Sequence, residues 1–472
     1  MYLGLDLGTS GLKALLVDDA QRVVGEGVGA LSVRRPHDGW SEQAPSSWIE
    51  ACRKACAGLD LSGVRAVGLS GQMHGATLLG ADDAPLRPCM LWNDTRAHAE
   101  AAELDDDEAR RITGNIVFPG FTAPKALWVA RHEPAVWARV RRVLLPKDYL
   151  RIWLTGEAVG EMSDAGGTAW LETGARRWSD RMLERTGLSR DAMPRLVEGS
   201  EVSGHVRDAV AAELGLPRGV PVAGGGGDNA AAAVGAGIVR PGTAFASLGT
   251  SGVLFAATQG YAPAPKTAVH TFPHAVPGGW HQMGVILAAT DALEWLSRMT
   301  GRGAADLTAD LGELRAPGRA LFLPYLGGER TPHNDAALRG AFLGLSHATG
   351  PEEAARAVLE GVAFAFADCA DALAATGTRI ERLLGIGGGS RSAYWCGAVA
   401  TALGIAVERP VAGDFGGAFG AARLAMMADG AGAAVATVPP IADVVEPLER
   451  LRDAFAEGHA RYRAAHDAVR AL

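Results

Sequence analysis

DLGTSG at residues 6–11 recurs as SLGTSG at residues 247–252, and this repeat decides the predicted fold. Each copy lies between two runs of apolar residues, a pattern typical of a tight turn at the tip of a β-hairpin. A match of this length also arises by chance. The same strand–turn–strand context, once in each half of a 472-residue chain, nevertheless indicates two related lobes.

The residues after each hairpin support the same division. In both halves, β-type runs alternate with helical periodicity and end in glycine-rich turns, which predicts mixed sheets covered by helices on both faces. The expected strands are 22–33, 64–70, 280–288 and 382–386, and the expected helices are 43–59, 290–300, 352–374 and 447–472. A further strand, glycine-rich turn and helix are expected within 414–427. Pro241-Gly242 ends an alanine-rich helix, so we place the lobes at 1–241 and 242–472.

The composition is that of an ordinary globular protein. Hydrophobic residues make up 48% of the chain and charged residues 21%, which excludes disorder as the main state. The net charge of −8 argues against a nucleic-acid partner and against a polybasic membrane anchor. No apolar run approaches the ~20 residues of a membrane helix. The chain opens as a strand without a signal-peptide pattern and has five cysteines, an odd number, so we expect a cytoplasmic, reduced protein.

Both repeated turns have the composition of phosphate-binding loops. Glycine, threonine and serine at a tight tip expose backbone N–H groups and hydroxyls that suit phosphate oxygens. One such turn is also an ordinary hairpin, but two, one in each lobe, favour a nucleotide clamped between the lobes. Only the first turn is preceded by an acid, Asp6. A carboxylate beside phosphate needs a cation, so Asp6 suggests Mg²⁺ held directly or through water; a strand-end hydrogen-bond acceptor is the alternative.

Asp228 follows four glycines, residues 224–227, and stands at the N-terminus of a helix expected at 230–237. Glycines let a ligand approach the backbone closely, and the helix terminus favours an ionised carboxylate. An ordinary N-cap also explains the aspartate, but a cap does not require a glycine run before it. We therefore expect Asp228 to accept a hydroxyl proton during phosphoryl transfer.

Two further groups of residues complete the candidate site. GIGGGSRS at residues 385–392 runs from a strand into a helix, and a flat ring or a ribose would fit against its glycines. A polyol site needs directional donors and acceptors beside an aromatic wall, and the candidates for it are His74, Asn93, Asp94, Arg96, Trp40 and Trp92. Each of these residues taken alone is more simply explained by a structural role.

These segments resemble, in order, those of a known family, the FGGY family of carbohydrate kinases. The resemblance extends from Met1 to at least Arg423 and is carried by DLGTSG, WSEQ, GQMHGATLL, LWNDTR, PGFTAPK, LLPKDYL, SDAGGT, GGGDNAA, SLGTSG and GIGGGSRS. It is strongest to the members that act on xylulose. It implies an α/β fold of two actin-like (ribonuclease H-like) ATPase lobes with a central cleft. It also implies ATP with Mg²⁺, a ketopentose substrate phosphorylated at its terminal hydroxyl to give D-xylulose 5-phosphate, and it permits a homodimer.

The resemblance also implies roles for individual residues. Asp228 resembles the proton acceptor of the family, and Asp6 its metal-linked acid. Met73 and His74 are similar to its sugar-binding pair. Further implied sugar contacts are Asn229, Trp92 and Asp94, and the implied ATP contacts are Gly8, Thr9, Ser10, Lys13, Gly249, Thr250, Gly388, Gly389 and Ser392. The family commonly has two or three glycines before the aspartate that corresponds to Asp228. The four glycines found here put the flexibility of that loop in doubt.

Three alternatives compete with a family member that acts on xylulose. Another FGGY kinase would act on ribulose, gluconate or glycerol; Gln72-Met73-His74 favours xylulose, whereas Arg96 is a candidate partner for a gluconate carboxylate. A non-catalytic actin-like ATPase would lack both the polyol pocket and the aspartate behind a glycine run. A Rossmann-type redox enzyme is excluded, because no glycine run has an acid about twenty residues later in a βαβ unit.

Overall fold

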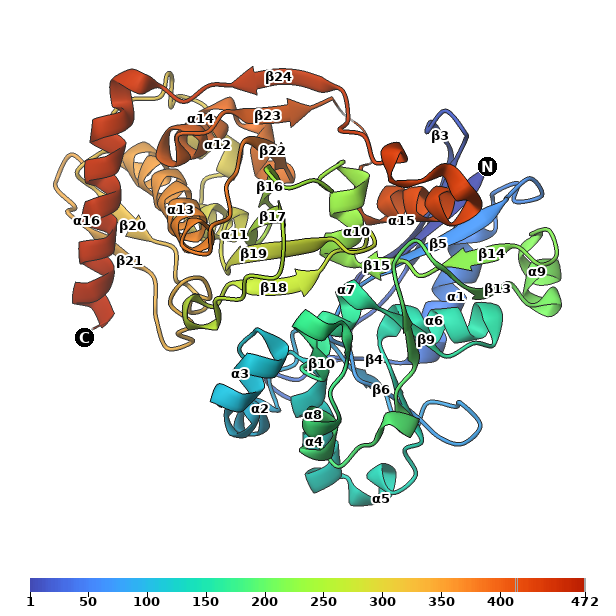
Figure 1. Cartoon of the computed structure of the whole chain (residues 1–472). Helices are drawn as coiled ribbons and strands as arrows, with labels where there is room; N and C mark the ends of the chain where they lie inside the picture. The colour runs from blue at the N-terminus through green and yellow to red at the C-terminus, as the bar shows by residue number, and fades with distance from the viewer. Residues whose placement is uncertain (412, 414, 471–472) are drawn as a thin grey trace. The chain divides into compact units, whose positions relative to one another are not determined.

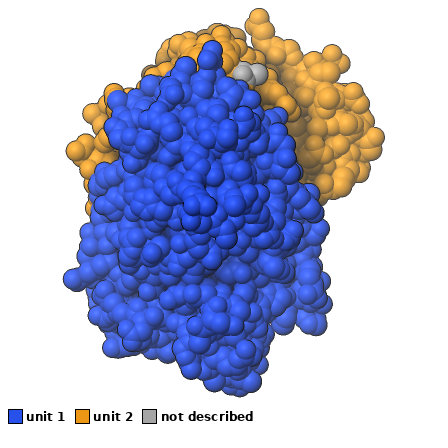
Figure 2. Space-filling view, turned by 90° about the vertical axis from the view of Figure 1, so that its right-hand side faces the viewer, with its two compact units in different colours: residues 1–239, 271–280, 414–438 blue, residues 240–270, 281–413, 439–472 orange. Residues whose placement is uncertain are grey.

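The computed structural model describes residues 1–411, 413 and 415–470 (Figure 1). Position 414, the start of the predicted strand, turn and helix at 414–427, and positions 471 and 472, the end of the predicted C-terminal helix, lie outside the described residues. The chain separates into two compact units (Figure 2). Unit 1 consists of Met1–Val239, Thr271–Trp280 and Asp414–Val438, and unit 2 of Arg240–His270, His281–Gly413 and Pro439–Leu472.

The sheet of unit 1 is built on the first predicted hairpin. β1 (Tyr2–Leu7) pairs antiparallel with β2 (Gly11–Val17), and β5 (Ala66–Gly71) lies parallel to β1 on its other side. The strand order is β13-β14-β5-β1-β2-β3, with β15 also paired to β5; the remaining bounds are β3 (Val23–Ala30), β13 (Val202–His205), β14 (Pro221–Ala223) and β15 (Gly226–Gly227). β1, β5 and β15 run parallel. The residues that follow these three strands therefore leave the same edge of the sheet.

Helices cover both faces of this sheet. Alternate leucines of β1 join a core with α1 (Pro45–Cys56) and α6 (Pro146–Thr155) on one face. The other face carries α15 (Gly417–Met426), which also packs on α10 (Asp228–Gly235). A Cβ added at Gly4 would lie 1.9 Å from Ala418 O, so β1 admits no larger residue there. Glycine lets the α15 backbone approach the strand backbone directly, which accounts for part of the high glycine content of the chain.

The sheet of unit 2 repeats this arrangement around the second hairpin. β16 (Thr243–Leu248) pairs antiparallel with β17 (Gly252–Thr258), and β22 (Arg382–Ile386) lies parallel to β16. The strand order is β18-β19-β17-β16-β22-β23-β24, with β18 (His270–Pro273), β19 (Trp280–Ile286), β23 (Val407–Pro410) and β24 (Ile441–Val445). The last six strands match the order β3-β2-β1-β5-β14-β13 of unit 1. The internal repeat predicted from the two LGTSG turns is therefore confirmed.

Unit 2 is held together by a large apolar core beside its sheet. Its helices are α11 (Thr290–Thr300), α12 (Ala304–Thr308), α13 (Pro351–Ala374), α14 (Ala393–Leu403) and α16 (Arg452–Arg470). α13 is buried along most of its length and packs on α14 and on β20 (Leu321–Leu323), which pairs with β21 (Ala341–Leu343). Trp395 of α14 fixes this contact, because its ring N–H donates to Leu359 O of α13 at 3.1 Å.

The remaining elements belong to long connections between the strands of the sheets. They are β4 (Glu42–Gln43), β6 (Thr77–Leu79), β7 (Cys89–Met90), β8 (Arg142–Leu144), β9 (Val159–Glu161), β10 (Leu171–Glu172), β11 (Arg177–Trp178), β12 (Arg195–Val197), α2 (His98–Leu104), α3 (Asp107–Thr113), α4 (Thr122–His132), α5 (Pro134–Trp137), α7 (Met162–Ala165), α8 (Asp180–Glu184) and α9 (Asp208–Leu214). Across the described residues, every helix is too short or too polar to traverse a lipid bilayer.

Most predicted elements are present, with shifted ends. The strand at 382–386 and the helix at 290–300 have the predicted bounds. The helix predicted at 230–237 instead begins at Asp228, and Gly227 is its N-cap. Asp228 therefore lies in the first helical turn and is not the cap residue considered from the sequence.

Candidate active site

The first glycine-rich turn is closed and firmly anchored. Gly8 N donates to Gly11 O at 2.9 Å, which closes the turn between β1 and β2. The Thr9 hydroxyl donates to Gln72 Oε1 at 3.1 Å and accepts from the Trp92 ring N–H at 3.0 Å. Ser10, at the tip, is exposed. The network ties the turn to the segment after β5 and leaves its tip open to a ligand.

Asp6 stands at the end of β1, one strand from the segment after β5. Ser70 of β5 donates its hydroxyl hydrogen to Asp6 Oδ1 at 2.7 Å. A Cβ at Gly417 would lie 2.8 Å from Asp6 Cγ, so α15 begins directly against this carboxylate. Lys13 is the cross-strand neighbour of Asp6 on β2, and its ammonium lies 3.3 Å from the Glu26 carboxylate.

Asp228 follows β15 at the same sheet edge. Asn229 donates twice to its Oδ1, from the backbone N at 2.7 Å and from Nδ2 at 3.0 Å. Burial, with a smaller contribution from the negative charge of Asp6, raises the pKa of Asp228 to about 6 against the opposing effect of the Asn229 donors. The sequence-based expectation that the helix terminus keeps Asp228 ionised stays a prediction, and burial opposes it by raising the pKa. Two carboxylates that repel each other at a sheet edge form a donor set suited to a hard divalent cation.

Met73 and His74 follow β5, and Met73 faces the last glycine of the run. A Cβ at Gly227 would lie 2.9 Å from Met73 Sδ, so the thioether packs against the residue before Asp228. His74 has φ +70°, its ring stacks on Phe121 at 4.8 Å, and its Nδ1 lies 2.7 Å from Gly167 O. The structure thus brings Met73, His74 and Asp228 to one edge of unit 1.

Asp94 and Arg96 form a buried pair behind this edge. Arg96 donates to both Asp94 oxygens, with Nη2 2.6 Å from Oδ2, and its guanidinium lies 3.4 Å from the centre of the Trp40 ring. Ser41 N adds a further donor to Asp94 Oδ2 at 2.7 Å. Trp92 is 49% exposed and alone among these aromatic side chains offers a large free surface. Because Arg96 is already paired with Asp94 inside the protein, it is not available to bind a gluconate carboxylate. That was the reason for considering gluconate as a substrate.

The two glycine-rich turns of unit 2 contact each other. Gly387, with φ +84°, follows β22, and a Cβ there would lie 2.9 Å from Leu248 C and 3.1 Å from Gly249 N. The carbonyls of Gly249 and Thr250 accept backbone N–H groups at the start of α11. Ser392 caps α14, its hydroxyl accepting from Trp395 N at 3.2 Å. Glycine at 387 is required by its backbone conformation and by the close approach of the β16 turn.

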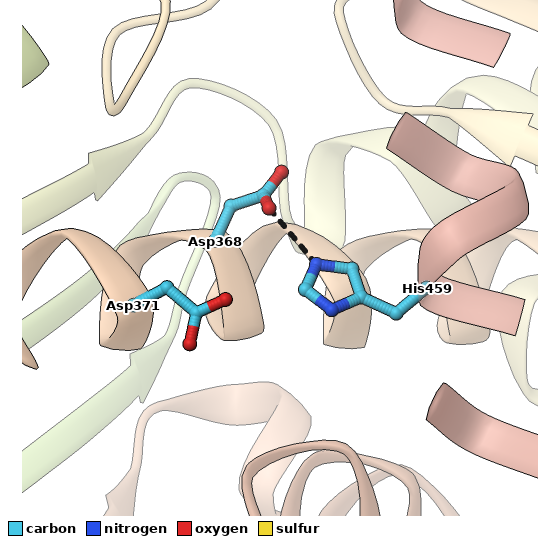
Figure 3. A group of neighbouring side chains, drawn as sticks. All are labelled: Asp368, Asp371 and His459. Carbon is cyan, nitrogen blue, oxygen red and sulfur yellow. Dashed lines mark hydrogen bonds and ion pairs between the residues drawn. The ribbon is translucent and has the colours of Figure 1, made fainter. Parts of the chain in front are cut away.

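Another cluster of candidate metal ligands lies in unit 2, on α13 and α16 (Figure 3). Asp368, Asp371 and His459 place ligand atoms within 4.8 Å of one another, and His459 Nε2 lies 2.9 Å from Asp368 Oδ1. Arg463 donates to both carboxylates at 2.7 Å. Because this guanidinium already compensates the two charges, we assign the cluster to helix packing.

Sequence reasoning missed the lysine beneath His74. Lys125 of α4 is fully buried and its Nζ donates to His74 O at 3.0 Å and to Gly120 O at 2.6 Å. Burial lowers its pKa to about 7. A lysine inside the otherwise apolar PGFTAPKALWV segment was the available signal. Its two hydrogen bonds tie α4 to the backbone at His74, where φ is positive.

With this geometry in place, comparison with known proteins identifies the family. Residues 1–235 match the FGGY family of carbohydrate kinases, N-terminal domain, and residues 244–428 match its C-terminal domain. The chain belongs to this family. It is a carbohydrate kinase, which implies a small-molecule sugar as acceptor, ATP as phosphoryl donor and a divalent metal ion.

Three relatives illustrate the likeness. The chain is 49% identical to a xylulose kinase of Escherichia coli (strain K12) over 91% of this chain and 90% of that protein, and 50% identical to one of Klebsiella pneumoniae with the same coverage. A crystal structure described as a xyloylose kinase from Brucella ovis is 57% identical, covers 100% of this chain and 99% of that one, and superposes with a TM-score of 0.98. The predicted fold of two actin-like ATPase lobes is confirmed by this likeness.

Proposed function

We propose that this kinase transfers the γ-phosphoryl group of ATP to the terminal hydroxyl of D-xylulose, giving D-xylulose 5-phosphate. The observation that carries the proposal is the convergence of Asp228, Met73 and His74 at one sheet edge of unit 1, beside the turn at Gly8–Ser10. The two xylulose kinases named above support the proposal, since they are 49% and 50% identical to this chain over 91% of its length.

We assign Asp228 as the general base. Asn229 fixes Oδ1 with two donors, and no described residue donates to Oδ2. Oδ2 would accept the proton of the sugar hydroxyl as that oxygen attacks phosphorus. A pKa of about 6 keeps most of the carboxylate ionised at neutral pH while leaving it more basic than an ordinary aspartate.

The sugar is assigned to the side chains around Asp228. Met73 supplies an apolar contact, His74 and Asn229 supply polar groups, and Trp92 supplies an exposed ring against which the carbon chain packs. Asp94 was expected to contact the sugar as well. Its oxygens are already occupied by Arg96 and Ser41, so we propose that it orients the LWNDTR loop that carries Trp92.

The phosphates and the metal are assigned to the glycine-rich turns. In unit 1, Gly8, Thr9, Ser10 and Lys13 would bind phosphate, and Asp6 would hold Mg²⁺, most simply through water. In unit 2, the proposed ATP contacts are Gly249, Thr250, Gly388, Gly389 and Ser392, where Ser392 contributes as the cap of α14. When bound, the cation neutralises phosphate charge and offsets the repulsion between Asp6 and Asp228. Holding the cation requires no proton transfer by Asp6 or Asp228.

The lobe limits 1–241 and 242–472, a cytoplasmic location and a homodimer remain proposals. The location is supported by the five cysteines, all of which are buried thiols. Sedimentation analysis of the purified protein measures the oligomeric state directly.

The substrate assignment is tested by ADP release from ATP-Mg²⁺ with D-xylulose, D-ribulose, gluconate, glycerol or no sugar. We expect D-xylulose to give the highest kcat/KM and gluconate to give none, because Arg96 is buried. A higher kcat/KM with another sugar would refute the xylulose assignment. ADP release that ignores every sugar would point instead to an actin-like ATPase.

A further inference from the structure

Residues 161–168 connect two parts of the proposed sugar site. The segment leaves β9, passes through the short helix α7 and ends in a 3₁₀ turn at Gly166–Thr168. Near its start, Ser163 Oγ accepts a hydrogen bond from Gly227 N at 3.1 Å. Near its end, Gly167 O lies 2.7 Å from His74 Nδ1. The segment therefore contacts both the residue before Asp228 and the proposed sugar-binding histidine.

The hydroxyl of Ser163 is fixed in one orientation. Ser163 is fully buried, and its Oγ donates to Glu161 Oε1 at 2.9 Å. Glu161 also accepts the backbone N–H groups of Ser163 and Asp164, and Lys147 Nζ lies 3.6 Å from its Oε1. Because the single hydroxyl hydrogen points to Glu161, the lone pairs of Oγ face Gly227. The Gly227 amide thus donates to a hydroxyl oxygen whose position is fixed by its own hydrogen bond to Glu161.

The glycine run needs such external support. Residues 224–227 carry no side chains, and Gly225 has φ +81°, so this backbone has more conformational freedom than any other residue type would give it. Arg151 holds the start of the run, donating to Ala223 O at 2.7 Å and to Gly224 O. Ser163 holds its end. Backbone hydrogen bonds from Gly224 N and Gly225 N and the pairing of β15 with β5 restrain the run as well. Ser163 adds the side-chain acceptor for the amide directly before Asp228.

We propose that Ser163 is a positioning residue for phosphoryl transfer, whose hydroxyl fixes the Gly227 amide and thereby the place of the Asp228 carboxylate. This inference rests on the proposed function, because it takes Asp228 as the base. Without the hydroxyl, Asp228 spends less time within reach of the attacking oxygen, whereas the Gly167 contact to His74 persists. The loss therefore falls on kcat and not on sugar binding.

The test compares Ser163→Ala with wild type in steady-state kinetics on D-xylulose. Ser163→Ala removes one atom and adds no volume, and we expect kcat to fall on the order of 10- to 100-fold, since misplacing a catalytic group by about 1 Å has effects of that size. KM for D-xylulose should change by less than about twofold, as for loss of an interaction made in the transition state. Ser163→Thr retains the hydroxyl and should restore most of kcat.

Thr113→Val is the matched control. The Thr113 hydroxyl is equally buried, accepts Asn115 N at 3.2 Å and donates to Ala109 O at 2.8 Å, but it does not touch the glycine run. The Thr113→Val substitution should lower Tm and leave kcat unchanged. The inference is overturned if Ser163→Ala lowers Tm as the control does with kcat intact, or if KM alone rises. Wild-type turnover is measured first, so a failure of the proposed function shows there and not in the variants.

Discussion

Asp228 sits in surroundings that disfavour its own charge. Burial and the nearby Asp6 carboxylate raise its pKa from 3.8 to about 6, so the folded protein binds a proton at this site more readily than the unfolded chain does. Above pH 6 the Asp228 carboxylate is ionised in the folded state, and because its surroundings disfavour this charge the folded state is less stable. As pH falls from 6 towards 4 the folded protein takes up the proton, and this penalty disappears.

Asp228→Asn should therefore stabilise the protein while removing the base. At pH 7.5, without ligands and with chelator present, we expect a gain of about 1–3 kcal/mol in unfolding free energy, the upper end corresponding to a two-unit pKa shift. The gain should vanish near pH 4. Thermal or urea unfolding across this pH range measures it.

Asp38→Asn is the control for that prediction, because Asp38 is exposed and its replacement should leave stability nearly unchanged at every pH. A loss of stability for Asp228→Asn at pH 7.5 would show that the Asn229 donors outweigh burial. The raised pKa, and with it the case for an unusually basic aspartate, would then be wrong.

At the scale of elements, the contact between α10 and α15 determines where Asp228 stands. α10 begins at the proposed base, and α15 begins against Asp6. A Cβ at Gly420 of α15 would lie 1.7 Å from Ala231 O of α10. The two helices thus pack backbone to backbone, and any side chain at this glycine must separate them.

Gly420→Ala tests that contact, since helix propensity and packing predict opposite results. Propensity alone favours alanine by about 1 kcal/mol. Overpacking costs roughly 1–3 kcal/mol or more, so we expect a lower Tm. We also expect a lower kcat, because α10 carries Asp228. Gly58→Ala, where no atom lies within 4 Å of the added Cβ, should change neither. An unchanged Tm and kcat for Gly420→Ala would show that the α10–α15 spacing does not constrain the site.

Which elements could be predicted from sequence follows from how local their signals are. The hairpin tips and the strand 382–386 follow from alternating apolar residues and glycine turns, which are local. The location of α15 on the sheet of unit 1 could not be predicted, because it depends on contacts with Gly4 and Gly68, far away in the chain.

The same distinction applies to the site residues. The positions of Asp228 and Met73 at one edge follow from parallel strands, whereas the pairing of Asp94 with Arg96 and the support from Ser163 depend on burial. The spacing of residues in the sequence does not indicate that Arg96 is buried and paired with Asp94. Side-chain burial and partners are properties of the folded chain, and they decide between binding and structural roles.

At the scale of the whole molecule, one supersecondary arrangement is used twice for different purposes. Both units place a glycine-rich hairpin turn beside a parallel strand, but only unit 1 has an acid, Asp6, before its turn; unit 2 has Ser247 in the corresponding place. Among the described residues, the aspartate after a glycine run at that edge is Asp228 of unit 1. The two units thus share the hairpin turn, whereas the proposed general base belongs to unit 1.

The most direct test of the central claim is the identity of the product. Wild-type protein is incubated with ATP-Mg²⁺ and D-xylulose, and ³¹P NMR follows the sugar phosphate while ADP is measured in the same sample. We predict one product, phosphorylated at the terminal C5 oxygen and equimolar with ADP, and less than a few per cent of that turnover for Asp228→Asn, as expected on loss of a general base. Inorganic phosphate in place of sugar phosphate, or full turnover by Asp228→Asn, would contradict the account.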